Sequence, residues 1–185
     1  MPLKVSFQLS DSDLEYLRKL MRDSRRALKN GDGEAITTAT KRLLGEMERA
    51  GVSDFVRERM DGLQNLCNMV EDSEWCLEAE DRDRVLGAMA YFCDPKDMIP
   101  DQIPGLGYLD DAVLVEIVCQ DLRHEIEAYR DFCQYRDAES QRRGKGDDPA
   151  TRKEWIATRR IQLQERMRRR RKALWDARLG RQSIW

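Results

Sequence analysis

The sequence has little of what catalytic and metal-binding sites usually require. It contains one histidine, His124, and five cysteines, none of which stands in C-x-x-C spacing with another. The glycine motifs of P-loops, dinucleotide-binding folds and serine hydrolases are all absent. These absences argue against zinc, nucleotide and serine-hydrolase chemistry, and we expect His124 to have a structural or solvated role.

Long apolar runs are also missing. The longest, at 85–93 and 112–119, are far shorter than the roughly 20 residues that span a bilayer. Residues 1–10 lack the basic-then-apolar pattern of a secretion signal. The widely spaced, odd-numbered cysteines do not resemble a disulfide framework. We therefore expect a cytoplasmic protein with buried free thiols.

Charge, by contrast, is abundant and unevenly distributed. Charged residues make up 37% of the 185 residues, well above the usual quarter or so. From Thr151 onward there are 12 basic and 3 acidic residues, a net charge of +9. The preceding 150 residues hold the remaining 21 basic and 32 acidic residues, a net charge of −11. This asymmetry indicates an interaction tail on an acidic body.

Apolar residues recur at helical spacing through most of the chain, which predicts an all-α fold. Ser10 and Ser53 are expected to cap helices, and Gly51 to end one. We expect a compact body of about five helices and then a long basic helix from about Pro149 to Leu179. The predicted body helices lie at about 10–30, 34–50, 53–70, 81–93 and 110–135.

These patterns also predict how the chain is divided. Residues 137–149 are polar and contain Gly144, Gly146 and Pro149, which is typical of a linker. The predicted parts are an N-terminal helical part at 1–80, a helical hairpin at 81–136, a linker at 137–149 and a basic helical arm at 150–185.

A turn rich in aspartate and proline joins the two helices of the predicted hairpin. Residues 94–111 read D-P-x-D-x-I-P-D-x-I-P-x-x-G-x-x-D-D. The prolines exclude a continuous helix, the aspartates can accept local backbone N–H groups, and Asp110 or Asp111 is expected to cap the next helix. The residues with a predicted structural role are Asp94, Pro95, Ile99, Pro100, Ile103, Pro104 and Gly107.

This motif resembles the signature of the YkvA-like family, a bacterial domain of unknown function, over about residues 81–135. The resemblance implies two helices joined by the turn, and it implies no established activity or cofactor. Lys96 and Gln102 stand where the family commonly has a more apolar residue, which argues against insertion of this turn into a membrane.

The same turn carries the alternative of a metal site. Four carboxylates, those of Asp97, Asp101, Asp110 and Asp111, could converge, and clustered carboxylates suit magnesium or calcium. A metal-dependent enzyme built on these residues is therefore the alternative to a purely structural turn. The absence of other catalytic motifs favours a protein that is not an enzyme.

The basic arm combines charge with apolar and aromatic residues. Ile156, Leu163, Met167 and Leu174 form a narrow seam of coiled-coil spacing around the run of cations at 168–172. The residues expected to bind an acidic partner are Arg159, Arg160, Arg166, Arg168, Arg169, Arg170, Arg171, Lys172, Trp155 and Trp175.

Three partners fit such an arm. Arginines and tryptophans suit RNA or a ribosomal surface, through phosphate contacts and base stacking. The opposite charges of arm and body favour docking on the protein's own body or on a second copy. A basic amphipathic helix with tryptophans can also lie on an anionic membrane. Our hypothesis from the sequence is a non-enzymatic binding protein whose arm engages an acidic partner, either RNA or its own body.

Overall fold

The computed structural model describes residues 8–27, 33–93, 107–143 and 148–182, and this part of the chain is all-α, without a strand. The fold class is therefore confirmed, although the described body has six α-helices rather than about five. The elements are α1 (Asp11–Ala27), α2 (Gly33–Ala50), α3 (Asp54–Glu71), α4 (Ala79–Met89), the 3₁₀ helix η1 (Ala90–Cys93), α5 (Leu109–Asp121), α6 (Arg123–Arg143) and α7 (Pro149–Gln182).

Three local predictions of helix ends are confirmed. The Asp13 N–H donates to Ser10 Oγ at 3.3 Å, and the Ser10 N–H donates to Asp13 Oδ2 at 2.8 Å, which forms a reciprocal cap at the start of α1. Ser53 Oγ accepts the Val56 N–H at 3.4 Å and caps α3. Gly51 follows α2 with a φ of +62°, in the left-handed region that glycine tolerates best.

The predicted fifth helix is wrong in two respects. It is interrupted at Leu122, whose φ of −102° and ψ of 17° separate α5 from α6. No proline or glycine marks this break in the sequence. The Asp121 carbonyl accepts a hydrogen bond from Arg84 Nη2 at 3.2 Å, so a backbone acceptor at the break is paired by a side chain of α4.

The second error is the length of the helix, because α6 continues to Arg143 instead of ending near Tyr135. Residues 137–143, which the composition predicts to be linker, are therefore helical. The polar composition of this stretch reflects a solvated helix rather than an irregular connection. The division into domains stays a prediction.

Helix α5 lies in the interior of the body and packs against α3 and α6. Its buried apolar residues point in several directions, so the sequence shows an apolar run instead of a one-sided stripe. A Cβ on Gly62 of α3 would lie only 2.8 Å from Cys119 Sγ of α5, so the glycine allows this close approach. The α5 residues at most 3% exposed are Ala112, Leu114, Val115, Ile117 and Val118.

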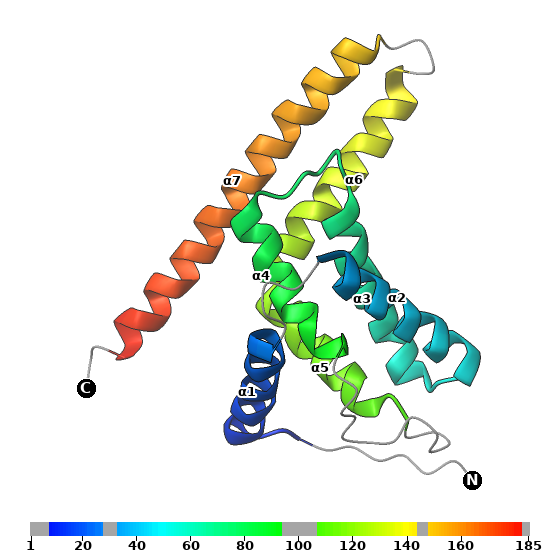
Figure 1. The fold of residues 1–185 in the computed structure, drawn as a ribbon. Helices are drawn as coiled ribbons and strands as arrows, with labels where there is room; N and C mark the ends of the chain where they lie inside the picture. Colours follow the sequence, from blue (N-terminus) through cyan, green and yellow to red (C-terminus); the bar gives the residue numbers. More distant parts are fainter. Residues whose placement is uncertain (1–7, 28–32, 94–106, 144–147, 183–185) are drawn as a thin grey trace.

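Helix α7 runs antiparallel to α6 at the edge of the molecule, and its C-terminal end projects beyond the body (Figure 1). Four of its residues belong to the same apolar core as α3, α5 and α6, namely Trp155, Ile156, Leu163 and Met167. The basic arm is therefore packed on the body as an integral helix. Within the described ranges, every helix is too short or too polar to cross a membrane.

Candidate interaction site

Three residues of the apolar seam of α7, Ile156, Leu163 and Met167, belong to the core of the body, and the fourth, Leu174, is partly buried. Leu163 and Met167 are each 1% exposed. Trp155 is 9% exposed and packs edge-on against Tyr135 of α6, with ring centroids 5.7 Å apart. Burial of such side chains stabilises the docked helix by about 1.5–3 kcal/mol each.

Next to this seam lies a group of five charged side chains, which we call the buried ion-pair cluster: Asp81, Arg84, Glu125, Arg168 and Arg171. Asp81 of α4 and Glu125 of α6 are each 1% exposed. Arg171 Nη1 joins them, at 2.7 Å from Asp81 Oδ1 and 3.1 Å from Glu125 Oε1. Arg168 Nε donates to Asp81 Oδ2 at 2.9 Å, and Arg84 Nε to Glu125 Oε1 at 2.9 Å.

The physical chemistry of this cluster makes the body depend on α7. A buried carboxylate without a partner carries a desolvation penalty of several kcal/mol. Charge-assisted hydrogen bonds from arginine offset that penalty. Arg84 supplies one such bond from the body itself, whereas Asp81 receives both of its arginines from α7. The body and the arm therefore complete a single charge network.

A second contact forms at the turn between α3 and α4. Gln164 of α7 is 4% exposed, and its Nε2 donates to the Trp75 carbonyl at 2.8 Å. Arg152 Nη2 lies 3.0 Å from Glu74 Oε1 in the same turn. The turn is thus held by both charged and neutral groups of α7.

Asp72 fixes the conformation of this turn. Its Oδ1 accepts the N–H groups of Glu74 and Trp75 at 2.9 and 3.1 Å, and its Oδ2 accepts Arg136 Nη1 at 2.8 Å and Tyr129 Oη at 3.1 Å. Burial acts to raise the pKa of Asp72, but the Trp75 N–H, Arg136 and the Glu74 N–H outweigh it and lower that pKa. Burial, assisted by Cys133 and Asp72, raises the pKa of Tyr129, which therefore stays neutral and donates.

Replacing Asp72 with asparagine is expected to lower the free energy of unfolding by about 1.5–3 kcal/mol at pH 7, because hydrogen bonds to a charged group are lost. Since the folded-state pKa is lowered, this contribution is complete above the ordinary aspartate pKa of about 3.9 and disappears as the pH falls through the folded-state value. Denaturant unfolding from pH 7 to pH 2 measures the difference. Asp83→Asn, at an exposed position of α4, is the control, and a pH-independent difference for Asp72→Asn would contradict the account.

The remaining cations of the arm divide between the body and the solvent. Arg160 reaches the Glu74 carbonyl at 3.4 Å, and Arg159 lies over the Tyr135 ring, 5.1 Å from its centroid. Three cations, Lys153, Arg169 and Lys172, are exposed and form no ion pair within the described residues, and Trp175 is exposed beside Lys172. The other ion pairs to the body are Arg166 with Asp131 and Arg170 with Glu127.

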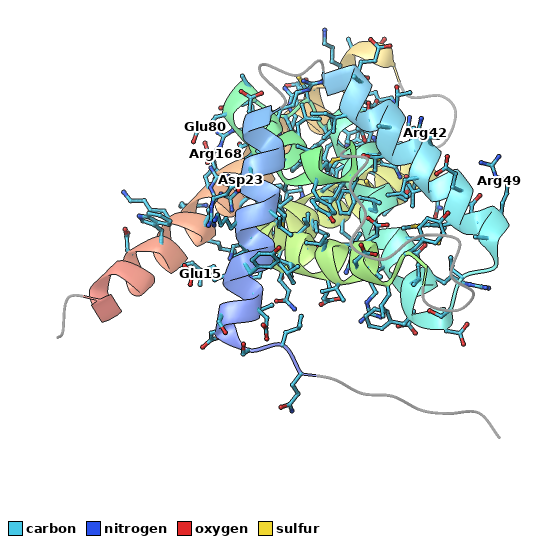
Figure 2. The ribbon with its side chains drawn as sticks, turned by 60° about the horizontal axis from the view of Figure 1, so that its bottom comes forward. Glu15, Asp23, Arg42, Arg49, Glu80 and Arg168 are labelled. Carbon is cyan, nitrogen blue, oxygen red and sulfur yellow. The ribbon has the colours of Figure 1, made fainter. Side chains whose placement is uncertain are left out.

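Figure 2 shows where charges of the body lie relative to this helix. Arg168 appears in the same region of the view as Glu80, at the start of α4. Arg42 and Arg49 extend from α2 on the other side of that view, and both are exposed. These two arginines provide charge controls that are remote from α7.

The aspartates of the predicted metal site are only partly within the described structure. Asp110 and Asp111 are each 7% exposed and lie in the first turn of α5, near its positive end. The N-cap residue is Tyr108, with a φ of 63°, so the prediction that Asp110 or Asp111 caps this helix is wrong. Among the described side chains, no three histidine, cysteine or acidic residues group as metal ligands. Magnesium or calcium binding stays a prediction.

Most of the turn lies outside the described residues. Gly107 is described and precedes Tyr108 in the turn before α5. The predicted structural and metal-binding residues outside the described ranges are Asp94, Pro95, Asp97, Ile99, Pro100, Asp101, Ile103 and Pro104.

The structure describes the environment of the single histidine and of most cysteines. His124 is partly buried, with Nδ1 3.7 Å from Glu127 Oε2. Four cysteines are free in the described structure, namely Cys67, Cys76, Cys119 and Cys133. Cys67 is buried as expected and two are partly buried, but Cys76 is exposed, which corrects the prediction of buried thiols. Burial and the nearby Glu116 raise the pKa of the Cys119 thiol to about 11, so it remains protonated at neutral pH.

Sequence reasoning missed the acceptors of the arm, although a signal for them exists. Glu125 lies three residues after Leu122 and four before Tyr129, on the apolar face of its helix, and Asp81 lies four residues before the buried Val85. An acidic residue within an apolar face predicts a buried partner of opposite charge. The spacing of apolar residues alone does not reveal this signal.

The comparison with known proteins gives one match, which lies in the predicted hairpin that carries part of the buried ion-pair cluster. Residues 84–117 match a family model described as a protein of unknown function, DUF1232. No curated protein and no solved structure matches the chain. The DUF1232 segment is less than half of the chain and lies within the range predicted from the motif. It begins at Arg84 of the buried ion-pair cluster and ends at Ile117 of the interior helix α5.

Proposed function

We propose that this chain is a non-enzymatic interaction protein whose basic arm engages an acidic partner, and that its own body is the first such partner. The observation that carries the proposal is the contact of Arg168 and Arg171 with Asp81 and Glu125, two carboxylates that are each 1% exposed. Buried carboxylates of this kind require cations, and α7 supplies them.

Counting the cations of the arm supports the body over an external polyanion. Between Thr151 and Asp176, where the structure describes the side chains, six of the ten basic residues contact oxygen atoms of the body, and the other four share this stretch with 3 acidic residues, which leaves a net +1. The six that contact these oxygens are Arg152, Arg160, Arg166, Arg168, Arg170 and Arg171. A polyanion that met the docked arm would thus find a modest excess of positive charge.

The experiment that tests this docking keeps the whole protein present. A specific protease site is placed in the connection between α6 and α7, the chain is cut, and the product is analysed by gel filtration. We expect α7 to remain bound to the body at low salt and to separate in the Arg168→Glu/Arg171→Glu variant. Arg169→Glu/Lys172→Glu removes two exposed cations instead and should leave the cut protein associated. Separation of the unmodified cut protein at low salt would contradict the proposal.

RNA or a ribosomal surface is the second candidate partner. It is favoured by Trp175, which is 63% exposed next to the exposed Lys172 and Arg169. An exposed tryptophan can stack on an unpaired base while cations contact phosphates. Binding through so few cations should be weak and should decline steeply with salt.

We also propose that the DUF1232 segment is the YkvA-like hairpin identified from the Asp/Pro motif, and that the protein acts in the cytoplasm. The match supports the first assignment because it lies within the predicted hairpin and contains the motif. The second is supported by the free thiols of Cys67, Cys76, Cys119 and Cys133, which are typical of a reducing compartment.

A further inference from the structure

The joint between α5 and α6 is built from residues that are compatible with an unbroken helix. Residues 118–126 contain neither glycine nor proline. The Leu122 N–H donates to the Val118 carbonyl at 2.9 Å, and the Leu122 carbonyl accepts the Ile126 N–H at 3.0 Å, as in a continuous α-helix. A broken and a continuous joint therefore differ by few local hydrogen bonds, and contacts from elsewhere in the fold can select between them.

One side chain of α4 contacts both sides of this joint. Arg84 Nη2 donates to the carbonyl of Asp121, the last residue of α5, at 3.2 Å. Its Nε donates to Glu125 Oε1, in the first turn of α6, at 2.9 Å. In an unbroken helix the Asp121 carbonyl would accept the Glu125 N–H, four residues later. Arg84 therefore holds the backbone acceptor at which the helix is broken.

Helix α7 reaches the same joint through Glu125. Arg171 Nη1 lies 3.1 Å from Glu125 Oε1, the oxygen that also accepts Arg84 Nε. Without Arg171, the 1% exposed Glu125 depends on Arg84 alone among the described cations. A guanidinium pairs best with a carboxylate through two parallel hydrogen bonds, and such a pair would take Arg84 Nη2 away from the Asp121 carbonyl.

We infer that this joint is a conformational relay, through which the docking of α7 sets the position of α5. With α7 docked, Arg84 bridges Glu125 and the Asp121 carbonyl, and the break is kept. When an acidic partner draws Arg171 away, Arg84 releases that carbonyl, and α5 and α6 approach a continuous helix. Coupling between distant sites requires such an element with two arrangements.

The relay would transmit the state of the arm to the DUF1232 segment. That segment, residues 84–117, begins at Arg84 itself and ends within α5. The inference rests on the docking of α7 proposed above, and it adds that docking changes the conformation of the body. It can fail while the docking proposal holds, because α7 can bind the body without moving α5.

Two native cysteines can report on the joint. Cys119 is half-buried, two residues before Asp121, and its Sγ lies 2.8 Å from the position of a Cβ on Gly62 of α3. Motion of the end of α5 against α3 therefore changes access to this thiol. Cys67 of α3 is 0% exposed and should react only when the whole body opens. The ratio of the two reaction rates separates motion at the joint from a general loss of stability.

Pulsed alkylation of the full chain at mildly alkaline pH, with each cysteine followed by mass spectrometry, tests the relay. We expect Arg171→Ala to raise the rate at Cys119 relative to Cys67 by about fivefold or more, the lower end of the range for coupled sites. Arg84→Ala, which frees the Asp121 carbonyl directly, should also raise the ratio. In a chain that carries Glu125→Gln, without the shared carboxylate, Arg171→Ala should change the ratio by less than about twofold.

Two exposed arginines serve as controls, Arg169 of α7 and Arg49 of α2. Arg169→Ala and Arg49→Ala should leave the ratio unchanged. Equal acceleration at Cys119 and Cys67 in Arg171→Ala would overturn the relay, because it would show only a general loss of stability. An unchanged Cys119 rate in Arg171→Ala, together with a cut chain that stays associated, would overturn the relay and leave the docking proposal standing.

Discussion

Replacing Arg171 with alanine is expected to lower the free energy of unfolding by about 3 kcal/mol, the lower end of the range for breaking a buried ion pair. The Arg171 guanidinium contacts both Asp81 and Glu125, which are each 1% exposed. Arg168 remains on Asp81 and Arg84 remains on Glu125 in the variant, so neither carboxylate loses its last cation. Urea unfolding at neutral pH and low salt measures the change.

The neighbouring Arg169 provides the matched control for Arg171. It has the same side chain and lies in the same run of the same helix, but it is exposed. Arg169→Ala should change the free energy of unfolding by less than about 0.5 kcal/mol. In a chain that already carries Asp81→Asn and Glu125→Gln, Arg171→Ala should cost much less than in the wild type. Equal effects of the two arginine substitutions would refute a special role for the buried ion-pair cluster.

Ending the chain at Asp148 is expected to have the largest effect of all, because the body then loses α7 entirely. Four apolar α7 side chains are at most 9% exposed in the docked helix, and at about 1.5–3 kcal/mol each their burial contributes about 6–12 kcal/mol. That amount is comparable to the whole stability of an ordinary domain, about 5–15 kcal/mol. In the shortened chain, water reaches Asp81 and Glu125 again, and the favourable hydration of these carboxylates offsets only part of the lost free energy.

Thermal unfolding followed by circular dichroism provides the measurement for this truncation. We expect the shortened chain to retain helical signal but to unfold over a broad range at a much lower temperature. Ending the chain at Gln182 removes only residues beyond α7 and serves as the control. A shortened chain with an unchanged melting temperature would mean that the arm is an appendage and that the buried ion-pair cluster contributes nothing to the body.

The helical class and the local caps could be predicted because they depend on neighbours in sequence. Ser10 and Asp13 are three residues apart, and Gly51 needs only its own backbone freedom to end α2. The break at Leu122 could not be predicted in this way. It accompanies the packing of α5 against α6 and a hydrogen bond to the Asp121 carbonyl from Arg84, which lies 37 residues before Asp121 in the chain.

The candidate interaction site likewise has features that the sequence predicts and features that depend on the folded structure. Charge composition predicted a basic arm and an acidic body, because the sum of charges needs no structure. It could not assign individual arginines: Arg168 and Arg171 face buried carboxylates, whereas Arg169, between them in the sequence, is exposed. Only the angle of each residue around the docked helix separates these roles.

The buried carboxylates and the arginines that pair with them are far apart in the sequence, and this has a consequence during synthesis of the chain. Arg168 and Arg171 lie 87 and 90 residues after Asp81. At about 5–20 residues per second, a ribosome adds Asp81 to the nascent chain roughly 4–18 s before it adds these partners. Throughout that interval the helices α4 and α6 cannot assume their final packing without an uncompensated carboxylate in the interior. The body is therefore expected to reach its native state only after the translation of α7, late in synthesis or after release.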